Sequence, residues 1–411
     1  MERPAKTVEH YAIPLIGRIV EECPDRVAGS ESERRAHEIL RREFEEVGLE
    51  TEFHHFRFNR SLYASFALHF GLATLAGLLY VQLPAAALAV ALTVGLSYLG
   101  DSTRRFYLLR RLLPFHRSRN LLGRLPADGE PRLRIALVAH ADAAYTGEIF
   151  EPDTLRASQS LPDGPFDLAE KPLRLATLSV FALAALCTAT ILAGPSVWLT
   201  AGVGLATIPP LLVALANLEV VLRDEIVPGA NDNLTGCAGA VMLADRLAEA
   251  KPDDVELVFV ATGAEETGGG GARALARDRV GSGDWGAEET VVVGLDGLTN
   301  GALHYFREAE VFTTPIPSFL VETIEEIRAD DEAHREIDLH EIPAGSTDVL
   351  PFRSLGVPGV CLGCVDPEFG APRHYHHPSD TLDNLDPEQF ERSVDFADRF
   401  VRRLMARREP E

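Results

Sequence analysis

Two long apolar segments without charge constrain this chain more than any other feature. Residues 61–100 and 175–218 contain no Asp, Glu, Lys or Arg. As a single helix, residues 61–100 would measure about 60 Å, twice the ~30 Å of a bilayer's hydrocarbon core. Each segment therefore predicts a transmembrane hairpin of two helices, with turns near Pro84 and near Gly194-Pro195. The alternative is a pair of buried or dimer-forming hairpins in a soluble protein. We disfavour it because one domain can hardly cover helices that are apolar on all faces.

The remainder of the 411-residue chain has the length and the pattern of one large α/β domain. Short apolar, β-branched runs are typical of buried strands in a mainly parallel sheet, and they lie at 133–142, 255–266 and 290–297. Helical patterns follow at 234–250, 270–278 and 387–407. This alternation predicts a mixed, mainly parallel sheet with helices on both faces. We expect one domain made of residues 1–60, 113–165 and 224–411, interrupted by the hairpins at 61–100 and 175–218.

Other parts of the α/β domain carry local secondary-structure patterns. Ser30 and Glu33 form a capping-box pattern at the start of an amphipathic helix over 30–48, and an alternating run at 50–58 predicts a strand. The charge-dense stretch 321–341 is interpreted as a solvated helix and its exit.

Composition excludes some classes of partner. The formal net charge is −23, with Asp+Glu 62 against Lys+Arg 39, and phosphate binding needs a basic surface, so no nucleic acid is expected. An acidic, Lys-poor chain suits either a salt-rich cytoplasm or a GC-rich genome. The five cysteines form no disulfide framework, and Cys361 and Cys364 are interpreted as small residues in or beside a buried strand.

Metal-binding residue types follow each of the three strand patterns. His140 and Asp142 end the first, Glu265 and Glu266 end the second, and Asp296 ends the third. A buried strand has no structural reason to finish this way three times, and open α/β sheets bind ligands beyond the carboxyl ends of their strands. These residues therefore predict one site at that edge of the sheet.

Two loop segments supply more candidate ligands. Residues 228–236 place Asp232 in a polar, Gly-flanked turn before a helix, and residues 373–381 contain His374, His376 and His377. Imidazoles and carboxylates without a thiolate suit zinc, with manganese or cobalt as substitutes. A paired-ion site also needs a carboxylate that bridges ions ~3.5–4 Å apart.

At these positions the sequence resembles the co-catalytic zinc exopeptidases, a family that includes bacterial aminopeptidases, glutamate carboxypeptidase and glutaminyl cyclase. The resemblance covers about residues 25–405 without the hydrophobic segments. The motifs that carry it are His140-Ala-Asp142, Asp232-Asn233, Glu265-Glu266, Asp296 and Tyr375-His376-His377-Pro378-Ser379-Asp380-Thr381.

The resemblance implies a role for each matched residue. One zinc ion would be bound by His140 and Asp296, the second by Glu266 and His376, with Asp232 as the bridge. Glu265 would be the general base, and Asp142 would orient His140. The family has Thr where this chain has His377, so a histidine beside His376 stays open as the ligand. In the segment 347–352, Val349 replaces a family histidine, which puts any role of that position in doubt.

The implied function is removal of N-terminal amino acids from peptides by water activated between two zinc ions. Peptides and, through the two hairpins, a lipid bilayer are the expected partners; the sequence does not fix an oligomeric state. Two alternatives remain: a catalytically silent membrane receptor or scaffold on a peptidase fold, and a glutaminyl cyclase. No ligand of the set is missing, and the adjacent Glu265 and Glu266 favour hydrolysis.

The two hairpins also predict which side of the membrane holds the site. His140 and Asp232 flank the second hairpin and must meet, so each hairpin returns the chain to the side that it left. The turns carry no Lys or Arg, whereas the outer flanks are rich in Arg. By the positive-inside rule, the catalytic domain is expected on the cytoplasmic side, in agreement with unpaired cysteines and with the absence of a signal-peptide pattern in residues 1–30.

Overall fold

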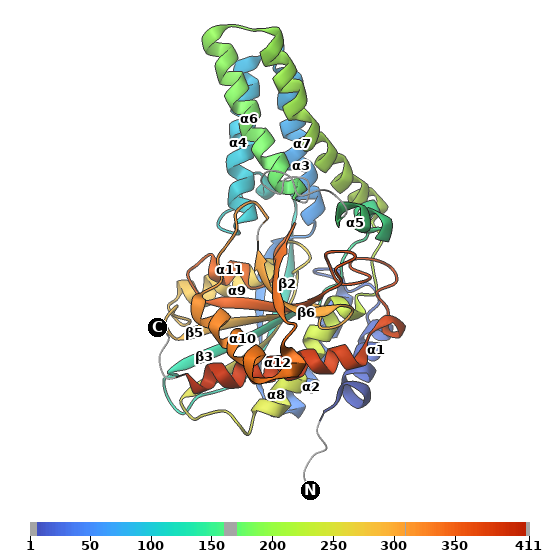
Figure 1. The fold of residues 1–411 in the computed structure, drawn as a ribbon, viewed down its shortest axis with the longest axis vertical. Coiled ribbons are helices and arrows are strands. Elements are labelled where there is room, and N and C mark those ends of the chain that lie inside the picture. The colour runs from blue at the N-terminus through green and yellow to red at the C-terminus, as the bar shows by residue number, and fades with distance from the viewer. Residues whose placement is uncertain (1–5, 160–170, 309, 408–411) are drawn as a thin grey trace.

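A computed structural model describes residues 6–159, 171–308 and 310–407. It contains an α/β domain built on an eight-stranded sheet, from which a bundle of four apolar helices extends (Figure 1).

The sheet is mixed, and its centre is parallel. Its strands are β1 (Glu50–Asn59), β2 (Phe115–Leu125), β3 (Leu133–His140), β4 (Val255–Thr262), β5 (Thr290–Leu295), β6 (Ala302–Glu308), β7 (Asp338–Ile342) and β8 (Gly359–Val365). They lie in the order β1-β2-β4-β3-β5-β8-β6-β7. The pairs β4-β3, β3-β5, β5-β8 and β6-β7 are parallel, and the others are antiparallel. The predicted mixed, mainly parallel α/β sheet is confirmed.

The helices of the α/β domain are α1 (Ile13–Glu22), α2 (Glu31–Glu46), α5 (Pro152–Gln159), α8 (Gly236–Leu247), α9 (Gly270–Gly281), α10 (Ser318–Asp330), α11 (Leu350–Arg353) and α12 (Pro387–Ala406). Short 3-10 or π-helical turns lie at Val8–Ala12, Leu109–Leu112, Glu148–Phe150, Ala230–Thr235, Glu332–His334 and Leu382–Asn384.

Alternation along the central strands gives the sheet two apolar faces, and helices cover both. In β3, Ile135 and Leu137 pack into the core with α1, α2, α8, α10 and α12. Ala136 and Val138 point the other way and pack with α9 and α11. A strand buried on both faces must be apolar throughout, which explains the continuous runs in the sequence.

Two predictions from local pattern differ from the structure. Ser30 caps α2, because its side chain accepts from the backbone N–H of Glu33. The Glu33 carboxylate does not return to Ser30; it is buried and accepts from the N–H groups of Gly29 and Ala264 and from the Ser118 hydroxyl. The charge-dense stretch ends in β7, an edge strand whose outward positions tolerate charge.

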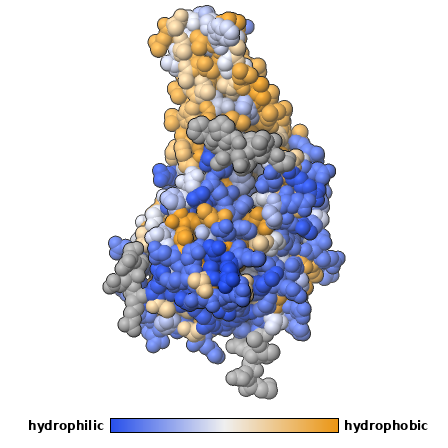
Figure 2. Space-filling model, in the orientation of Figure 1, coloured by the Kyte–Doolittle hydropathy of each residue, from blue (hydrophilic) through white to orange (hydrophobic). Residues whose placement is uncertain are grey.

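The apolar segments form two helical hairpins. The first hairpin is α3 (Leu62–Leu79) and α4 (Pro84–Ser102), and the second is α6 (Pro172–Ala193) and α7 (Val197–Arg223). Neighbours around the bundle are α3 with α4, α4 with α6, α6 with α7, and α7 with α3. All four helices are long and apolar enough to cross a membrane, and the face of the bundle seen in Figure 2 is mostly hydrophobic.

Both hairpins leave and rejoin the domain at one edge of the sheet. β1 and β4 are each antiparallel to β2, so β1 runs parallel to β4 and delivers α3 at the edge where β4 ends. The second hairpin follows β3, and its two flanking segments pair through the bridge of Tyr145 with Ile226. The carboxyl ends of the central strands therefore face the base of the bundle.

The five cysteines are free and buried. Cys361 and Cys364 lie in β8, as expected of small residues in a buried strand. They belong to the cores on opposite faces of the sheet, which excludes a joint metal or redox site.

Candidate metal centre

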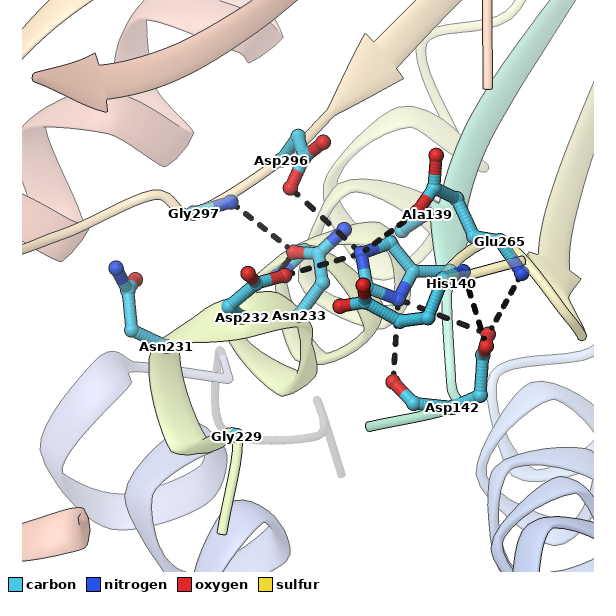
Figure 3. Close-up of polar contacts among 12 residues, drawn as sticks. Ala139, His140, Asp142, Gly229, Asn231, Asp232, Asn233, Glu265, Asp296 and Gly297 are labelled. Atoms are coloured by element: carbon cyan, nitrogen blue, oxygen red, sulfur yellow. Dashed lines mark hydrogen bonds and ion pairs between the residues drawn. The ribbon is translucent and has the colours of Figure 1, made fainter. Parts of the chain in front are cut away.

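The predicted strand-end residues converge beyond the carboxyl edge of the sheet (Figure 3). His140 is the last residue of β3, while Glu265 and Asp296 follow β4 and β5 in the turns that leave the sheet. Asp232 comes from the turn before α8, where Gly229 adopts a left-handed φ of 59°. The residues His140, Asp232 and Glu265 are each at most 8% exposed.

Asp232 lies between two histidines and offers one oxygen to each. Its Oδ1 is 3.1 Å from His140 Nε2, and its Oδ2 is 3.3 Å from His376 Nε2. Asp296 Oδ1 lies 3.7 Å from His140 Nε2, and Glu266 Oε2 lies 3.3 Å from His376 Nε2. The geometry divides these five side chains into two groups of one histidine and one terminal carboxylate each, joined by Asp232.

The carboxylates of the cluster raise the pKa values of both histidines. Burial disfavours a charged His140, but hydrogen bonds to Asp232 and Asp296 outweigh it and raise the His140 pKa well above its usual range. Burial also disfavours a charged His376. The carboxylates of Glu266 and Asp232 outweigh it and raise the pKa of His376 to about 10. Both shifts reflect an excess of carboxylates around the two rings, which a metal ion could balance.

The residues present fit metal ions. Ligand atoms of His140, Asp232 and Glu266 all lie within 4.8 Å of one another. Within the described residues, Glu266 Oε1 is buried without a hydrogen-bond partner. A buried carboxylate oxygen left free in this way is unfavourable unless a cation completes its coordination.

Two buried aspartates hold the ligand-bearing turns by their backbone. Asp142 accepts from the N–H groups of Glu265 (3.0 Å) and Glu266 (3.1 Å). Asp380 accepts in the same way from Asn231 (2.8 Å) and Asp232 (3.0 Å). Each carboxylate therefore fixes the direction in which its turn presents its acidic side chains.

Asp142 also lies beside His140, on the Nδ1 side of its ring. His140 Nδ1 is 3.2 Å from the backbone carbonyl oxygen of Asp142 and 3.7 Å from its Oδ1. In this structure the carbonyl, rather than the carboxylate, is the nearer partner of the ring. A partner at Nδ1 leaves Nε2 free to bind a metal ion.

Glu265 is the carboxylate outside the two histidine–carboxylate groups. Its Oε2 lies 4.0 Å from His140 Nε2, and burial raises its pKa well above its usual range. A buried carboxylate beside the cluster, with elevated proton affinity, has the properties of a general base.

The loop 373–381 brings one of its three histidines to the cluster. His376 adopts a left-handed φ of 49°, and its ring contacts those of Tyr375 and Phe150, at centroid distances of 4.0 and 4.6 Å. His374 and His377 are each 2.6 Å from the Ser379 hydroxyl through Nδ1. The geometry thus favours His376 among the histidines that the sequence left open.

Three residues near the cluster had no site role in the sequence analysis. Tyr63, in α3, contacts His376, and Asp380 holds the Asp232 turn. Asp348 is buried, accepts from the Thr262 hydroxyl, and has a pKa raised to about 7, chiefly by burial. Asp348 and Asp380 stood inside segments that carried the resemblance, whereas Tyr63 had no local signal.

The fold is that of the zinc exopeptidases and glutaminyl cyclases. A zinc aminopeptidase from Bacillus subtilis is similar with a TM-score of 0.55 and 15% identity, over 98% of this chain and 95% of that chain. A Zn-dependent exopeptidase from Parabacteroides distasonis and a glutaminyl cyclase from Fimbriiglobus ruber each show a TM-score of 0.55 and 13% identity, over 98% of this chain and 99% of theirs. Identities this low establish the fold alone.

A family model places part of the chain more narrowly. Residues 217–401 match the family described as Peptidase family M28. The matched part contains Asp232, Glu265, Glu266, Asp296 and His376, while His140 and Asp142 precede it. No curated protein sequence matches this chain. The family match supports a metallopeptidase.

Proposed function

We propose that this protein is a two-zinc exopeptidase that removes N-terminal amino acids from peptides. The observation that carries the proposal is the position of Asp232, which offers one oxygen to His140 and the other to His376. A bridging carboxylate between two histidine–carboxylate groups is the arrangement that a paired-ion site requires. His140 and Asp296 would hold one ion, and Glu266 and His376 the other.

The side chains divide the chemistry between them. When bound, zinc supplies Lewis acidity, which makes a water molecule nucleophilic near neutral pH and polarises the substrate carbonyl. Glu265 takes the proton of the attacking water and returns it to the leaving amine. Asp142 holds the turn that carries Glu265, so that the base keeps its position beside His140. A free substrate α-amine would lie against a site carboxylate, which favours cleavage at the amino terminus.

The first test is Glu265→Gln. The variant should retain zinc, because Glu265 lies outside the two ligand groups, and should lose at least ~100-fold in kcat, the scale of general-base catalysis. Purified protein is incubated with amino-acyl peptides, N-terminally blocked peptides and a peptide that begins with Gln. Normal turnover by the variant would reject the assignment of the base.

The same panel separates the alternatives. Release of amino acids from unblocked peptides, abolished by a chelator, supports the aminopeptidase. Loss of ammonia from the Gln peptide without cleavage would identify a glutaminyl cyclase, whose fold this chain shares. A protein that binds zinc but changes no peptide in the panel would favour the silent receptor.

We also propose that the two hairpins span a membrane, with the catalytic domain in the cytoplasm. Large apolar side chains are exposed along the helices rather than singly, as a bilayer contact requires; among them are Leu78, Leu96, Leu192, Trp198, Leu205, Leu212 and Leu215. The exposed basic residues beside the first hairpin are Arg57, Arg60, Arg105 and Arg111, all on the side of the α/β domain.

Cysteine labelling in intact cells tests this orientation. All five native cysteines are buried, so the background should be low. Ala85→Cys, exposed in the first turn of α4 beside the loop of the first hairpin, should react with an impermeant maleimide. Glu288→Cys, exposed on the α/β domain, should react only after permeabilisation. The opposite pattern would place the catalytic domain outside, and reaction of neither before permeabilisation would reject the spanning hairpins.

A further inference from the structure

We propose that Tyr63, carried by the first apolar helix, is a positioning residue of the metal centre that holds His376 in its metal-binding orientation. The proposal rests on the zinc site proposed above and assigns to the apolar bundle a part in that site.

The contact is direct and buried. Tyr63 is the second residue of α3, its side chain is 6% exposed, and its hydroxyl oxygen lies 3.2 Å from His376 Nδ1. The opposite nitrogen of the same ring, Nε2, lies 3.3 Å from both Asp232 and Glu266. Tyr63 therefore contacts the His376 ring on the side away from the ligand cluster.

The chemistry of imidazole sets the role of this contact. A histidine that binds a metal ion through Nε2 is neutral and carries its proton on Nδ1. That N–H then donates to the Tyr63 hydroxyl oxygen, which is in place to accept it. Hydrogen bonds of this kind fix the tautomer and the ring orientation of a metal ligand, and their loss lowers metal affinity about 10–100-fold.

His376 depends on Tyr63 more than His140 depends on any single partner. The Nδ1 of His140 faces two oxygens of Asp142, one from the carbonyl and one from the carboxylate. Within the described residues, Tyr63 is the hydrogen-bond partner of His376 Nδ1, and no carboxylate or carbonyl shares that role. A neutral phenol supports the ligand without adding negative charge, so its geometry, rather than its charge, carries the effect.

The apolar bundle fixes Tyr63 from several sides. Ser61 caps α3 and sets where the helix begins. The Tyr63 ring meets Phe150 edge-on at 6.1 Å, and Val220, near the end of α7, belongs to the same apolar cluster. Both hairpins thus contribute to the position of one hydroxyl group.

The other end of the first hairpin contacts the opposite part of the site. Beyond α4, Arg110 donates to the backbone carbonyl of Thr267, in the turn that follows Glu265 and Glu266. Asp101, near the end of α4, holds this guanidinium through Arg110 Nη1 at 2.9 Å. The first hairpin therefore touches both the His376 loop and the Glu265–Glu266 turn, which ties the bundle to the metal centre at two points.

The test compares Tyr63→Phe with Tyr80→Phe in the full chain. Tyr80 is a matched control: it is a buried tyrosine of the same hairpin, and its hydroxyl bonds Thr190 in α6 instead of a ligand. Zinc affinity is measured by competition with a chelator, and the ligand field is followed in the visible spectrum of the cobalt-substituted protein. Tyr63→Phe should weaken zinc binding by about 10-fold and shift the cobalt spectrum, while Tyr80→Phe changes neither.

The outcomes separate this proposal from the proposed function. Wild-type protein that binds no zinc would overturn both. Zinc-loaded wild type together with unchanged affinity and spectrum in Tyr63→Phe would overturn only the role of Tyr63. Equal losses in both variants would assign the effect to the stability of the hairpin and would also overturn it. If Tyr63→Phe does not fold, Tyr63→Leu, which also removes the hydroxyl group, must still show the altered cobalt spectrum.

Discussion

Replacing Asp142 by Asn changes one buried oxygen into an NH2 group at a point where both oxygens accept backbone hydrogen bonds. The amide oxygen can keep one partner, either Glu265 N–H or Glu266 N–H, and the NH2 group then faces the other donor. One charge-assisted hydrogen bond, worth about 1.5–3 kcal/mol, is lost, and the N–H left unpaired costs about 1–3 kcal/mol more. The local cost is therefore about 2.5–6 kcal/mol.

This cost affects the turn that carries the proposed general base, Glu265, and a proposed zinc ligand, Glu266. If about 3 kcal/mol of it is expressed as displacement of Glu266, the zinc dissociation constant should rise ~100-fold. Burial raises the pKa of Asp142 to about 6, so the assay is run at about pH 8, where the wild-type side chain is ionised. Chelator competition gives the zinc affinity, and turnover of an unblocked peptide gives kcat.

Asp386→Asn is the matched control for Asp142→Asn. Asp386 also accepts from two backbone N–H groups, those of Glu388 and Gln389, but it caps α12 away from the cluster. It should leave both stability and zinc affinity nearly unchanged, because Asn caps a helix about as well as Asp. An Asp142→Asn protein with wild-type zinc affinity and turnover would refute the reasoning about the turn.

Two further predictions concern stability. Burial, followed by the charge of Arg119, lowers the pKa of His37 from 6.5 to about 4, so the unfolded chain binds a proton between these values that the folded chain does not. The free energy of unfolding therefore decreases as pH falls below 6.5. In denaturant unfolding, His37→Gln should lose about 2 kcal/mol less of this free energy than wild type between about pH 7 and pH 5. Equal losses in the two proteins would contradict this. Gly271→Ala places a methyl group against Asn120 and the backbone of Gly263, just before Glu265, and should lower the stability of the fold by about 1–3 kcal/mol. Gly281→Ala has nothing within 4 Å of the added methyl group and should not lower it. Similar thermal unfolding of the two variants would refute this prediction.

The central strands and the apolar helices could be predicted because their signals are local. A strand buried on both faces reads as a continuous apolar run, and β3, β4 and β5 match the predicted positions closely. Edge and flanking strands lack that signal. β7 is polar along much of its length, and it is a strand only because β6 pairs with it.

The residues of the candidate site also differ in whether the local sequence could predict them. His140, Glu265, Glu266 and Asp296 were predictable because parallel strands end at one edge. Asp232 and His376 were candidates because of their loops and the motif resemblance. The roles of all six residues stay predictions. Tyr63 stands in an ordinary apolar helix, and its contact with His376 spans 313 positions. Nothing in the local sequence distinguishes it from the other tyrosines of the hairpins.

The distance in sequence between Tyr63 and His376 has a consequence for biosynthesis. All four apolar helices leave the ribosome before the segment with Glu265 and His376 is made. In a chain that inserts these helices as they emerge, the bundle already stands in the bilayer when the last ligands arrive, and it serves as the template against which they close. If the hairpins span a membrane as proposed, a chain that failed to insert would lack an ordered Tyr63 and an ordered Arg110, and a hydrolytic centre would mature only on correctly inserted molecules.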